Sequence, residues 1–220
     1  MNSSTPILNF VLYGSQNSSS ALKVYQSLIN KLVLVKKATN LHLANPNNID
    51  SLLKEIKGKT LFFPLFLMDG EEYNKLKSLI NNNFPFENTL GVSLCHYPAF
   101  LKTIFEGNLN TIFLMHGSNR YNNWEQHKNI IKYGEALGYR NFCFLEGAPN
   151  YRDIISEKLL KPEVVKITPL FFITGHHIQN DLIDQFLNNY DKKKWQVNSC
   201  FLEREEIIEG LIKIISEALK

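Results

Sequence analysis

The stretches FFPLFLMDGEEYNKL (residues 62–76) and KITPLFFITGHHIQNDL (residues 166–182) match each other and decide the fold. The match places Pro64 opposite Pro169, each near the end of an apolar run that leads into a glycine. Short apolar runs rich in aromatic and β-branched residues are typical of buried strands. A helix-length stretch follows each glycine. The sequence therefore predicts a strand–loop–helix unit that occurs twice.

Two further matches lie along the chain in the same order. VLYGSQNSS at residues 11–19 corresponds to FLMHGSNRY at residues 113–121. LANPNNIDSLL at residues 43–53 corresponds more loosely to LEGAPNYRDII at residues 145–155. One such match could arise by chance, whereas three in one order indicate an internal repeat.

The whole chain alternates short β-rich runs with helix-length stretches, which is typical of parallel sheets covered by helices. We therefore expect an α/β fold of two similar halves, residues 1–107 and 108–220, each a parallel sheet flanked by helices, facing across a central cleft. The expected strands are 7–12, 41–44, 60–67, 89–93, 111–115, 141–145, 164–173 and 196–201. The expected helices lie near 19–31, 49–57, 71–80, 99–105, 123–137, 152–160, 179–189 and 205–220.

The composition favours a folded cytoplasmic protein. Hydrophobic residues make up 44% of the chain and the net charge is only +3, which suits a buried core but not a nucleic-acid-binding surface. Three cysteines without close spacing predict reduced, buried thiols. The N-terminal stretch lacks the basic region of a signal peptide, and no apolar run reaches the roughly 20 residues that cross a bilayer. Motifs for ATP or nicotinamide binding are missing, so no nucleotide is expected.

Residues able to bind a metal or move a proton follow the expected strands of the second half. His116 and Glu146 each come directly after a buried run, and His177 stands in the loop after the next one. Ligands of parallel α/β folds bind at the carboxyl ends of the strands, and neutral imidazole is a common transition-metal ligand. The repeat pairs His116 with Tyr13 and His177 with Glu72. These loops therefore predict a metal site, to which Glu72 contributes from the first half.

Each candidate also has an ordinary structural interpretation. A histidine or glutamate after a strand is often only a hydrogen-bonded loop residue, and Ser118 or Asn119 could simply cap the next helix. His176 and His177 could be an exposed pair, of which at most one faces the site. Asp181, four residues beyond His177, could orient its imidazole ring, cap a helix or be a surface acid.

The turn after the first expected strand is a candidate anion site. Tyr13, Gly14 and Ser15 precede a run of three serines, and backbone N–H groups at a helix start can bind an anion. Simple helix capping is the alternative. Ser118 occupies the matching place in the second half, and Arg120 just after it is a candidate partner for a carboxylate or a solvated charge.

Three motifs of the second half carry a family resemblance: MHGS at 115–118, LEGAP at 145–149 and PLFFITGHHIQNDL at 169–182. In this order and spacing they resemble the class II, ATP-independent chelatases, and most closely the anaerobic cobalt chelatases that act on sirohydrochlorin in cobalamin synthesis. DGEEYNKL at 69–76 and TLGVSL at 89–94 resemble that family as well, so the similarity covers nearly the whole chain.

The resemblance implies a ligand set and a reaction. The family's metal ligands fall on His116, Glu146 and His177, and a further family acid falls on Glu72. The implied reaction inserts a divalent metal into sirohydrochlorin or a similar polycarboxylate tetrapyrrole without ATP, with His116 accepting a pyrrole proton. The metal is expected to be Co²⁺, although imidazole and carboxylate ligands also suit Fe²⁺, Ni²⁺ and Zn²⁺. A homo-oligomer is compatible with the family, and His176 stands where the family often has aspartate.

The first turn departs from the family, which usually has phenylalanine, glycine and threonine where this chain has Tyr13, Gly14 and Ser15. Two other classes of function stay open. A tetrapyrrole or metal carrier would bind its ligand stoichiometrically without turnover. A duplicated α/β module for a small anion would retain no metal, and its histidines would serve only as hydrogen-bond donors.

Overall fold

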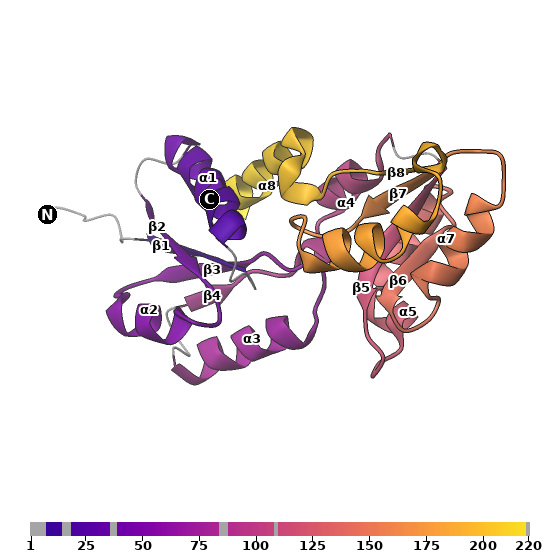
Figure 1. Cartoon of the computed structure of the whole chain (residues 1–220). Coiled ribbons are helices and arrows are strands. Elements are labelled where there is room, and N and C mark those ends of the chain that lie inside the picture. The colour runs from indigo at the N-terminus through magenta and orange to yellow at the C-terminus, as the bar shows by residue number, and fades with distance from the viewer. Residues whose placement is uncertain (1–7, 15–18, 36–38, 84–87, 108–109, 219–220) are drawn as a thin grey trace, which may run out of the picture. The chain divides into compact units, whose positions relative to one another are not determined.

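The computed structural model describes residues 8–14, 19–35, 39–83, 88–107 and 110–218 (Figure 1). The chain forms two compact units, one of Met1–Phe100 with Ile208–Lys220 and the other of Leu101–Ile207. Most of the C-terminal helix α8 (Glu205–Ala218) thus belongs to the first unit, although it follows the second unit along the chain. The division at residues 107 and 108 stays a prediction of the repeat.

Each unit contains a four-stranded parallel sheet, and the two sheets have the same topology. The first has the order β2-β1-β3-β4 and the second the order β6-β5-β7-β8. The expected fold class, two parallel sheets flanked by helices, is therefore confirmed. The strands are β1 (Leu8–Tyr13), β2 (Thr39–Ala44), β3 (Thr60–Pro64), β4 (Asn88–Leu90), β5 (Thr111–Gly117), β6 (Phe142–Glu146), β7 (Val165–Pro169) and β8 (Trp195–Val197).

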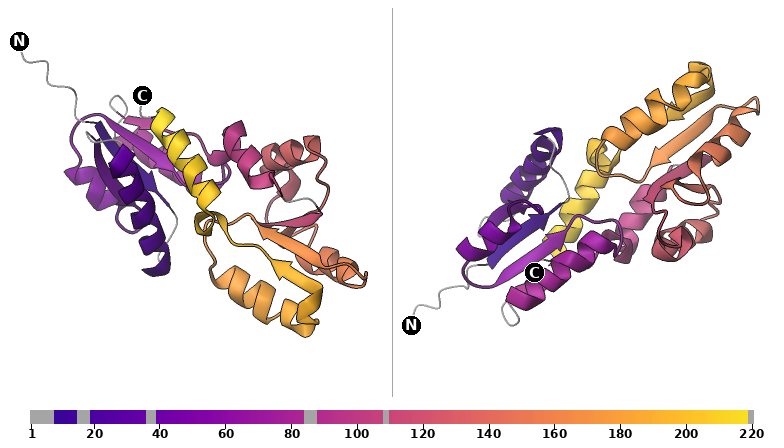
Figure 2. Two further views of the ribbon diagram at one scale, coloured as in Figure 1. Left: turned by 90° about the horizontal axis from the view of Figure 1, so that it is seen from above. Right: turned by 60° about the horizontal axis from the view of Figure 1, so that its bottom comes forward.

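The first sheet is covered on both faces, because side chains alternate along its strands. Val11 and Phe62 face a core that includes residues of α2 (Ile49–Glu55) and α3 (Glu71–Asn83). Helix α1 (Ser19–Val35) lies on the opposite face (Figures 1 and 2). Its buried Tyr25 reaches so close to Gly14 that a Cβ there would lie 3.1 Å from the ring.

The second sheet is layered in the same way. Ile112 and Leu114 of β5 pack with α7 (Tyr151–Leu159) and with the π-helix η2 (His177–Asp184). Phe113, between them, faces the other side, where its ring packs edge to face on Phe105 of α4 (Pro98–Phe105) with centroids 4.7 Å apart. The helices α5 (Asn123–Gln126) and α6 (Lys128–Ala136) follow β5. Short 3₁₀ helices are η1 (Leu94–His96), η3 (Leu187–Asn189), η4 (Lys192–Lys194) and η5 (Phe201–Glu203).

Several expected elements prove too long or of another type. The runs 60–67 and 164–173 are strand only to Pro64 and Pro169. One further backbone bond to the neighbouring strand follows each proline, from Leu65 N to Tyr13 O and from Leu170 N to Leu114 O, before the chain becomes a loop. The run 196–201 is strand only to Val197, and the expected helix 179–189 is instead a π-helix that begins earlier, at His177.

The structure agrees with one further expectation. Cys95, Cys143 and Cys200 are free and buried, as their spacing predicted. Among the described residues, no helix is both long enough and apolar enough to cross a membrane.

Candidate metal centre

His116 stands where β5 emerges from the core. The five preceding residues of the strand are buried, whereas His116 is exposed. Its Nδ1 lies 3.0 Å from the carbonyl oxygen of Gly117. A carbonyl oxygen can only accept a hydrogen bond, so Nδ1 carries the proton in this arrangement and Nε2 of a neutral ring keeps its lone pair.

His177 is held in the same way by a different acceptor. It is the first residue of η2, and its Nδ1 lies 2.7 Å from Oδ2 of Asp181. The carboxylate accepts the Nδ1 proton and leaves the lone pair on Nε2, which is the usual arrangement of a carboxylate behind a metal-binding histidine. Of the three interpretations of Asp181, the structure supports the orienting one. His176 is more exposed, and its Nε2 lies 3.8 Å from Oδ1 of the same carboxylate.

The two rings bring their free nitrogens together. Nε2 of His116 and Nε2 of His177 are 3.3 Å apart, and the rings meet edge to face at 86°. With both Nδ1 atoms donating to acceptors, neither Nε2 of the neutral pair has a proton to give. Two nitrogens that both carry lone pairs repel each other at this distance unless a cation or a proton binds them. The pair is therefore suited to binding a positively charged species.

The spacing also matches a metal geometry. In a tetrahedral site with metal–nitrogen bonds of about 2.0–2.1 Å, two ligand nitrogens are about 3.3–3.4 Å apart. The separation of the Nε2 atoms of His116 and His177 is 3.3 Å. The separation of the two nitrogens therefore suits one divalent ion.

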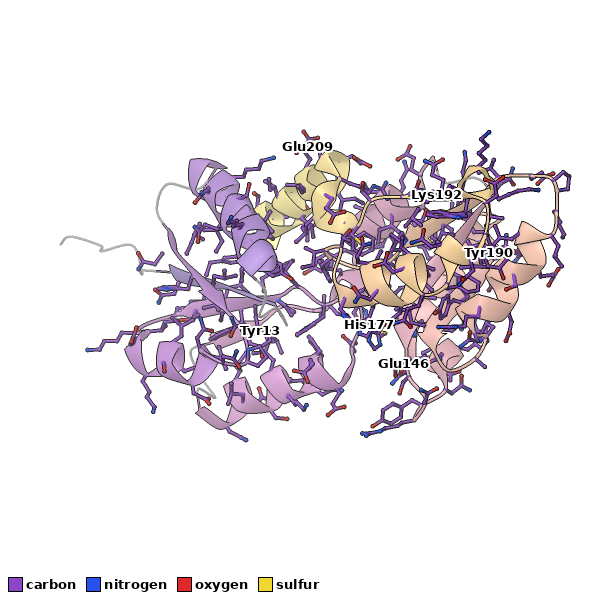
Figure 3. The ribbon with its side chains drawn as sticks, in the orientation of Figure 1. Tyr13, Glu146, His177, Tyr190, Lys192 and Glu209 are labelled. Carbon is purple, nitrogen blue, oxygen red and sulfur yellow. The ribbon has the colours of Figure 1, made fainter. Side chains whose placement is uncertain are left out.

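Glu146 ends β6 beside the same loop. Its backbone is in register with Gly117, the residue after His116, and Figure 3 shows Glu146 and His177 near the same edge of the second unit. As a residue, Glu146 is half-buried. No cluster of three or more His, Cys, Asp or Glu side chains that could hold a metal is present in the part of the chain that the structure describes. The structure thus brings together the two histidines and the backbone of Glu146, but not a complete three-residue ligand set.

Nothing in the sequence singles out Asn123 as a residue of the site. Its buried amide lies between the loop of His116 and the loop of Glu146 and bonds to both: Oδ1 accepts from Ser118 N at 2.7 Å and Nδ2 donates to Glu146 O at 2.8 Å. An asparagine near a helix start reads as an ordinary cap, so no signal in the sequence separates it from Asn122. In the structure Asn122 is the actual cap of α5.

Ser118 and Asn119 do not cap the next helix, because α5 begins only at Asn123. The hydroxyl of Ser118 accepts a hydrogen bond from Arg120 N at 3.0 Å, and this bond shapes the turn itself. Arg120 is exposed beside it, and Tyr121, the next residue, is 56% exposed. The turn therefore presents a cation and an aromatic ring to solvent close to the histidine pair along the chain.

The first-half candidates lie in the other unit. Tyr13 is only 4% exposed and packs in the core. Little of its side chain is therefore accessible to the ligand that the sequence predicted at this turn. Burial and then the negative charge of Glu72 raise the pKa of Tyr13, so these two residues lie within electrostatic range of each other. The Glu72 carboxylate accepts from Lys75 Nζ at 2.8 Å. Ser15 lies outside the described residues.

The strand register explains why Tyr13 is buried and His116 is not. Tyr13 is opposite Pro64, whereas Leu114 is opposite Pro169. If the two prolines are matched, Tyr13 corresponds in space to Leu114, and His116 lies two residues further along its strand. On the proline side of each sheet, the sequence match of Tyr13 with His116 is therefore offset by two residues. The longer β5 extends its histidine beyond the core on the same face, since side chains alternate along a strand.

The fold and this strand-end site define a class of protein. The structure of CbiX, the terminal enzyme for the biosynthesis of sirohaem in denitrifying bacteria, is similar over 97% of this chain and 100% of its own, with a TM-score of 0.67 and 15% identity. A multi-domain protein of Deinococcus radiodurans, described as structurally similar to chelatases, matches with a TM-score of 0.62 and 11% identity. That match covers 94% of this chain and 54% of the other. The fold is that of the chelatases.

The match to the family lies in the second half of the chain. The CbiX family model matches residues 110–218, which include both histidines and Glu146. The resemblance to the class II chelatases is thereby confirmed. The family identifies a tetrapyrrole metal chelatase, with a divalent metal as one substrate. Among curated protein sequences, none matches the chain.

Proposed function

We propose that this protein inserts Co²⁺ into sirohydrochlorin without ATP, and that His116 and His177 bind the metal before the transfer. The observation that carries the proposal is the pair of Nε2 atoms 3.3 Å apart, each with its Nδ1 proton held by an acceptor. The CbiX family match of residues 110–218 supports the reaction class.

The proposed metal site combines imidazole with carboxylate. His116 and His177 supply two nitrogens, and Glu146 supplies an oxygen when its side chain turns toward them. Glu72 of the first unit is proposed as a further acid that acts on the substrate. Imidazole and carboxylate bind Co²⁺ through exchangeable bonds, which suits a metal that must leave for the four nitrogens of a tetrapyrrole.

Insertion also requires that two pyrrole N–H protons leave the macrocycle. As the metal passes to the ring nitrogens, His116 and His177 regain free lone pairs on Nε2 and can accept protons there. The hydrogen bond from His177 Nδ1 to Asp181 stabilises the resulting imidazolium. The same two side chains thus release the metal and collect the protons, so no nucleotide is needed.

Sirohydrochlorin carries many carboxylates around a flat ring. Exposed Arg120 is proposed to pair with one of them, and exposed Tyr121 offers an aromatic face to the ring. Ser118 is proposed to contact the ligand from the same turn. Tyr13 and Ser15 remain proposed contacts of the first unit.

A second candidate metal is Fe²⁺. The similar structure of CbiX from denitrifying bacteria is described as the terminal enzyme of sirohaem biosynthesis. The same two imidazoles would hold either ion.

The test follows the absorbance of sirohydrochlorin under anaerobic conditions with Co²⁺, Fe²⁺ or Ni²⁺. We expect catalytic turnover, fastest with Co²⁺, and loss of turnover in His116→Ala and His177→Ala with unchanged circular dichroism. His176→Ala is the matched control, because this exposed neighbour makes no contact with His116 among the described interactions. Near-normal rates in both site variants would overturn the proposal, and stoichiometric binding without turnover would identify a carrier.

A further inference from the structure

A single buried amide joins the two loops of the candidate metal centre. Asn123 is 3% exposed, and each of its two side-chain ends bonds to a different loop. Oδ1 accepts from the backbone N–H of Ser118, two residues after His116, at 2.7 Å. Nδ2 donates to the backbone carbonyl of Glu146 at 2.8 Å and lies 3.5 Å from the carbonyl of Ala148.

The loops that Asn123 joins are too close together for ordinary residues. Gly117 and Gly147 have φ of +75° and +80°, in the left-handed region that L side chains rarely adopt. A Cβ on Gly117 would lie 2.7 Å from Cβ of Phe144, and one on Gly147 would lie 2.5 Å from Asn123 Nδ2. The His–Gly and Glu–Gly motifs of the sequence thus have a shared cause, because each glycine lets its loop approach the same amide.

The backbone of Asn123 is held in place by His127. Its backbone carbonyl accepts a hydrogen bond from Nδ1 of His127 at 2.9 Å, and His127 is 1% exposed. The ring of His127 also packs on Phe144 of β6, with centroids 4.9 Å apart. Asn123 is therefore held by the strand that ends in Glu146 as well as by its own helix. A side chain with so little freedom can set a distance between two loops.

We propose that Asn123 is a positioning residue of the metal centre: it sets the separation of the His116 turn and the Glu146 loop, so that an imidazole and a carboxylate can bind one ion. This inference rests on the proposed function. Asn123 touches neither metal nor tetrapyrrole. It acts through two backbone groups: its side chain accepts a hydrogen bond from Ser118 N and donates one to Glu146 O.

The substitution Asn123→Asp tests whether the hydrogen bond donated to Glu146 O is required. Aspartate has the same shape and keeps an oxygen for Ser118 N, but it replaces the donor to Glu146 O with an acceptor, so the Glu146 side of the contact becomes repulsive. Asn122→Asp is the matched control. Asn122 is exposed and only caps α5, and aspartate is an equally good cap.

The first measurement is Co²⁺ binding by the whole protein without tetrapyrrole, followed by the visible absorption spectrum of the bound ion. We expect Asn123→Asp to weaken Co²⁺ binding about 10- to 100-fold and to change the spectrum, because a carboxylate ligand is displaced. Asn122→Asp should resemble the unchanged protein. Unchanged affinity and spectrum in folded Asn123→Asp would overturn the inference.

A double-mutant cycle separates positioning from general stability. If Asn123 acts through Glu146, the Asn123→Asp change should weaken Co²⁺ binding little further in a Glu146→Ala background. A fully additive loss would contradict the inference. Asn123→Ser serves as a second variant if Asn123→Asp does not fold at 10 °C, and failure of both to fold would assign Asn123 to the fold instead. Absence of Co²⁺ binding in the unchanged protein would refute the proposed function, not the inference specifically.

Discussion

Asp181 offers the sharpest test of the histidine pair. Its Oδ2 accepts the Nδ1 proton of His177 at 2.7 Å, and this bond leaves the lone pair of His177 on Nε2, toward His116. Asp181→Asn keeps the size of the side chain but removes the charge. The new amide can also turn its NH₂ group toward Nδ1, and Nε2 would then carry the proton and could not bind a metal.

The magnitude follows from the exposure of the two groups. A hydrogen bond to a charged group contributes about 1.5–3 kcal/mol. The side chains of His177 and Asp181 are 44% and 31% exposed, so solvent screening reduces this to about 1–2 kcal/mol. Since each 1.4 kcal/mol is about tenfold in affinity, we expect Co²⁺ binding to weaken about 5- to 30-fold.

The assay is equilibrium dialysis of the metal-free protein against Co²⁺, together with the initial rate of metallation. Asp184→Asn is the matched control on the same π-helix, because Asp184 is exposed and accepts from Gln179 Nε2 at 3.1 Å instead of from a histidine. The reasoning fails if Asp181→Asn binds Co²⁺ within twofold of the unchanged protein, or if Asp184→Asn loses as much affinity.

Two further predictions concern the support of the site. Gly117→Ala should lower the free energy of unfolding by about 2–4 kcal/mol in urea titrations, because the new Cβ would overlap Glu146 at a residue with a left-handed φ. Gly138→Ala is the control: its φ is also left-handed, but no atom lies within 4 Å, so the loss should be only about 1–2 kcal/mol. Equal losses in the two variants would contradict this account. Burial lowers the pKa of His127 below 6.5, so the unfolded chain takes up a proton before the folded protein does. The free energy of unfolding should therefore fall as the pH drops below about 6.5, by at most about 1.4 kcal/mol per pH unit, and His127→Gln should remove part of that slope; parallel pH profiles of the two proteins would rule out His127 as the source.

The fold could be predicted because its signals are local or repeated. Alternating strands and helices, together with three matches in one order, were enough to predict two parallel sheets. The ends of elements were harder. The apolar run after Pro169 reads as more strand, and only the tertiary structure shows that it becomes the loop leading to His177. A buried loop and a buried strand have the same composition.

The candidate site was predictable at the level of elements but not of atoms. His116 and His177 follow different strands of one parallel sheet, and the carboxyl ends of such strands share an edge, so the sequence could predict that they come together. It could not predict the burial of Tyr13, whose side chain packs in the core beside the first sheet. It also gave no sign that Asn123, unlike its neighbour Asn122, bonds to two loops.

The sequence by itself thus determined the duplicated α/β fold and the strand ends at which the histidines lie, because periodicity and motif order are properties of the chain. Only the tertiary structure decided how those histidines meet. Their Nε2 atoms are free and 3.3 Å apart because Gly117 O and the Asp181 carboxylate each hold an Nδ1 proton. Hydrogen-bond direction and distance between residues far apart in the chain arise from packing, and no local pattern records them.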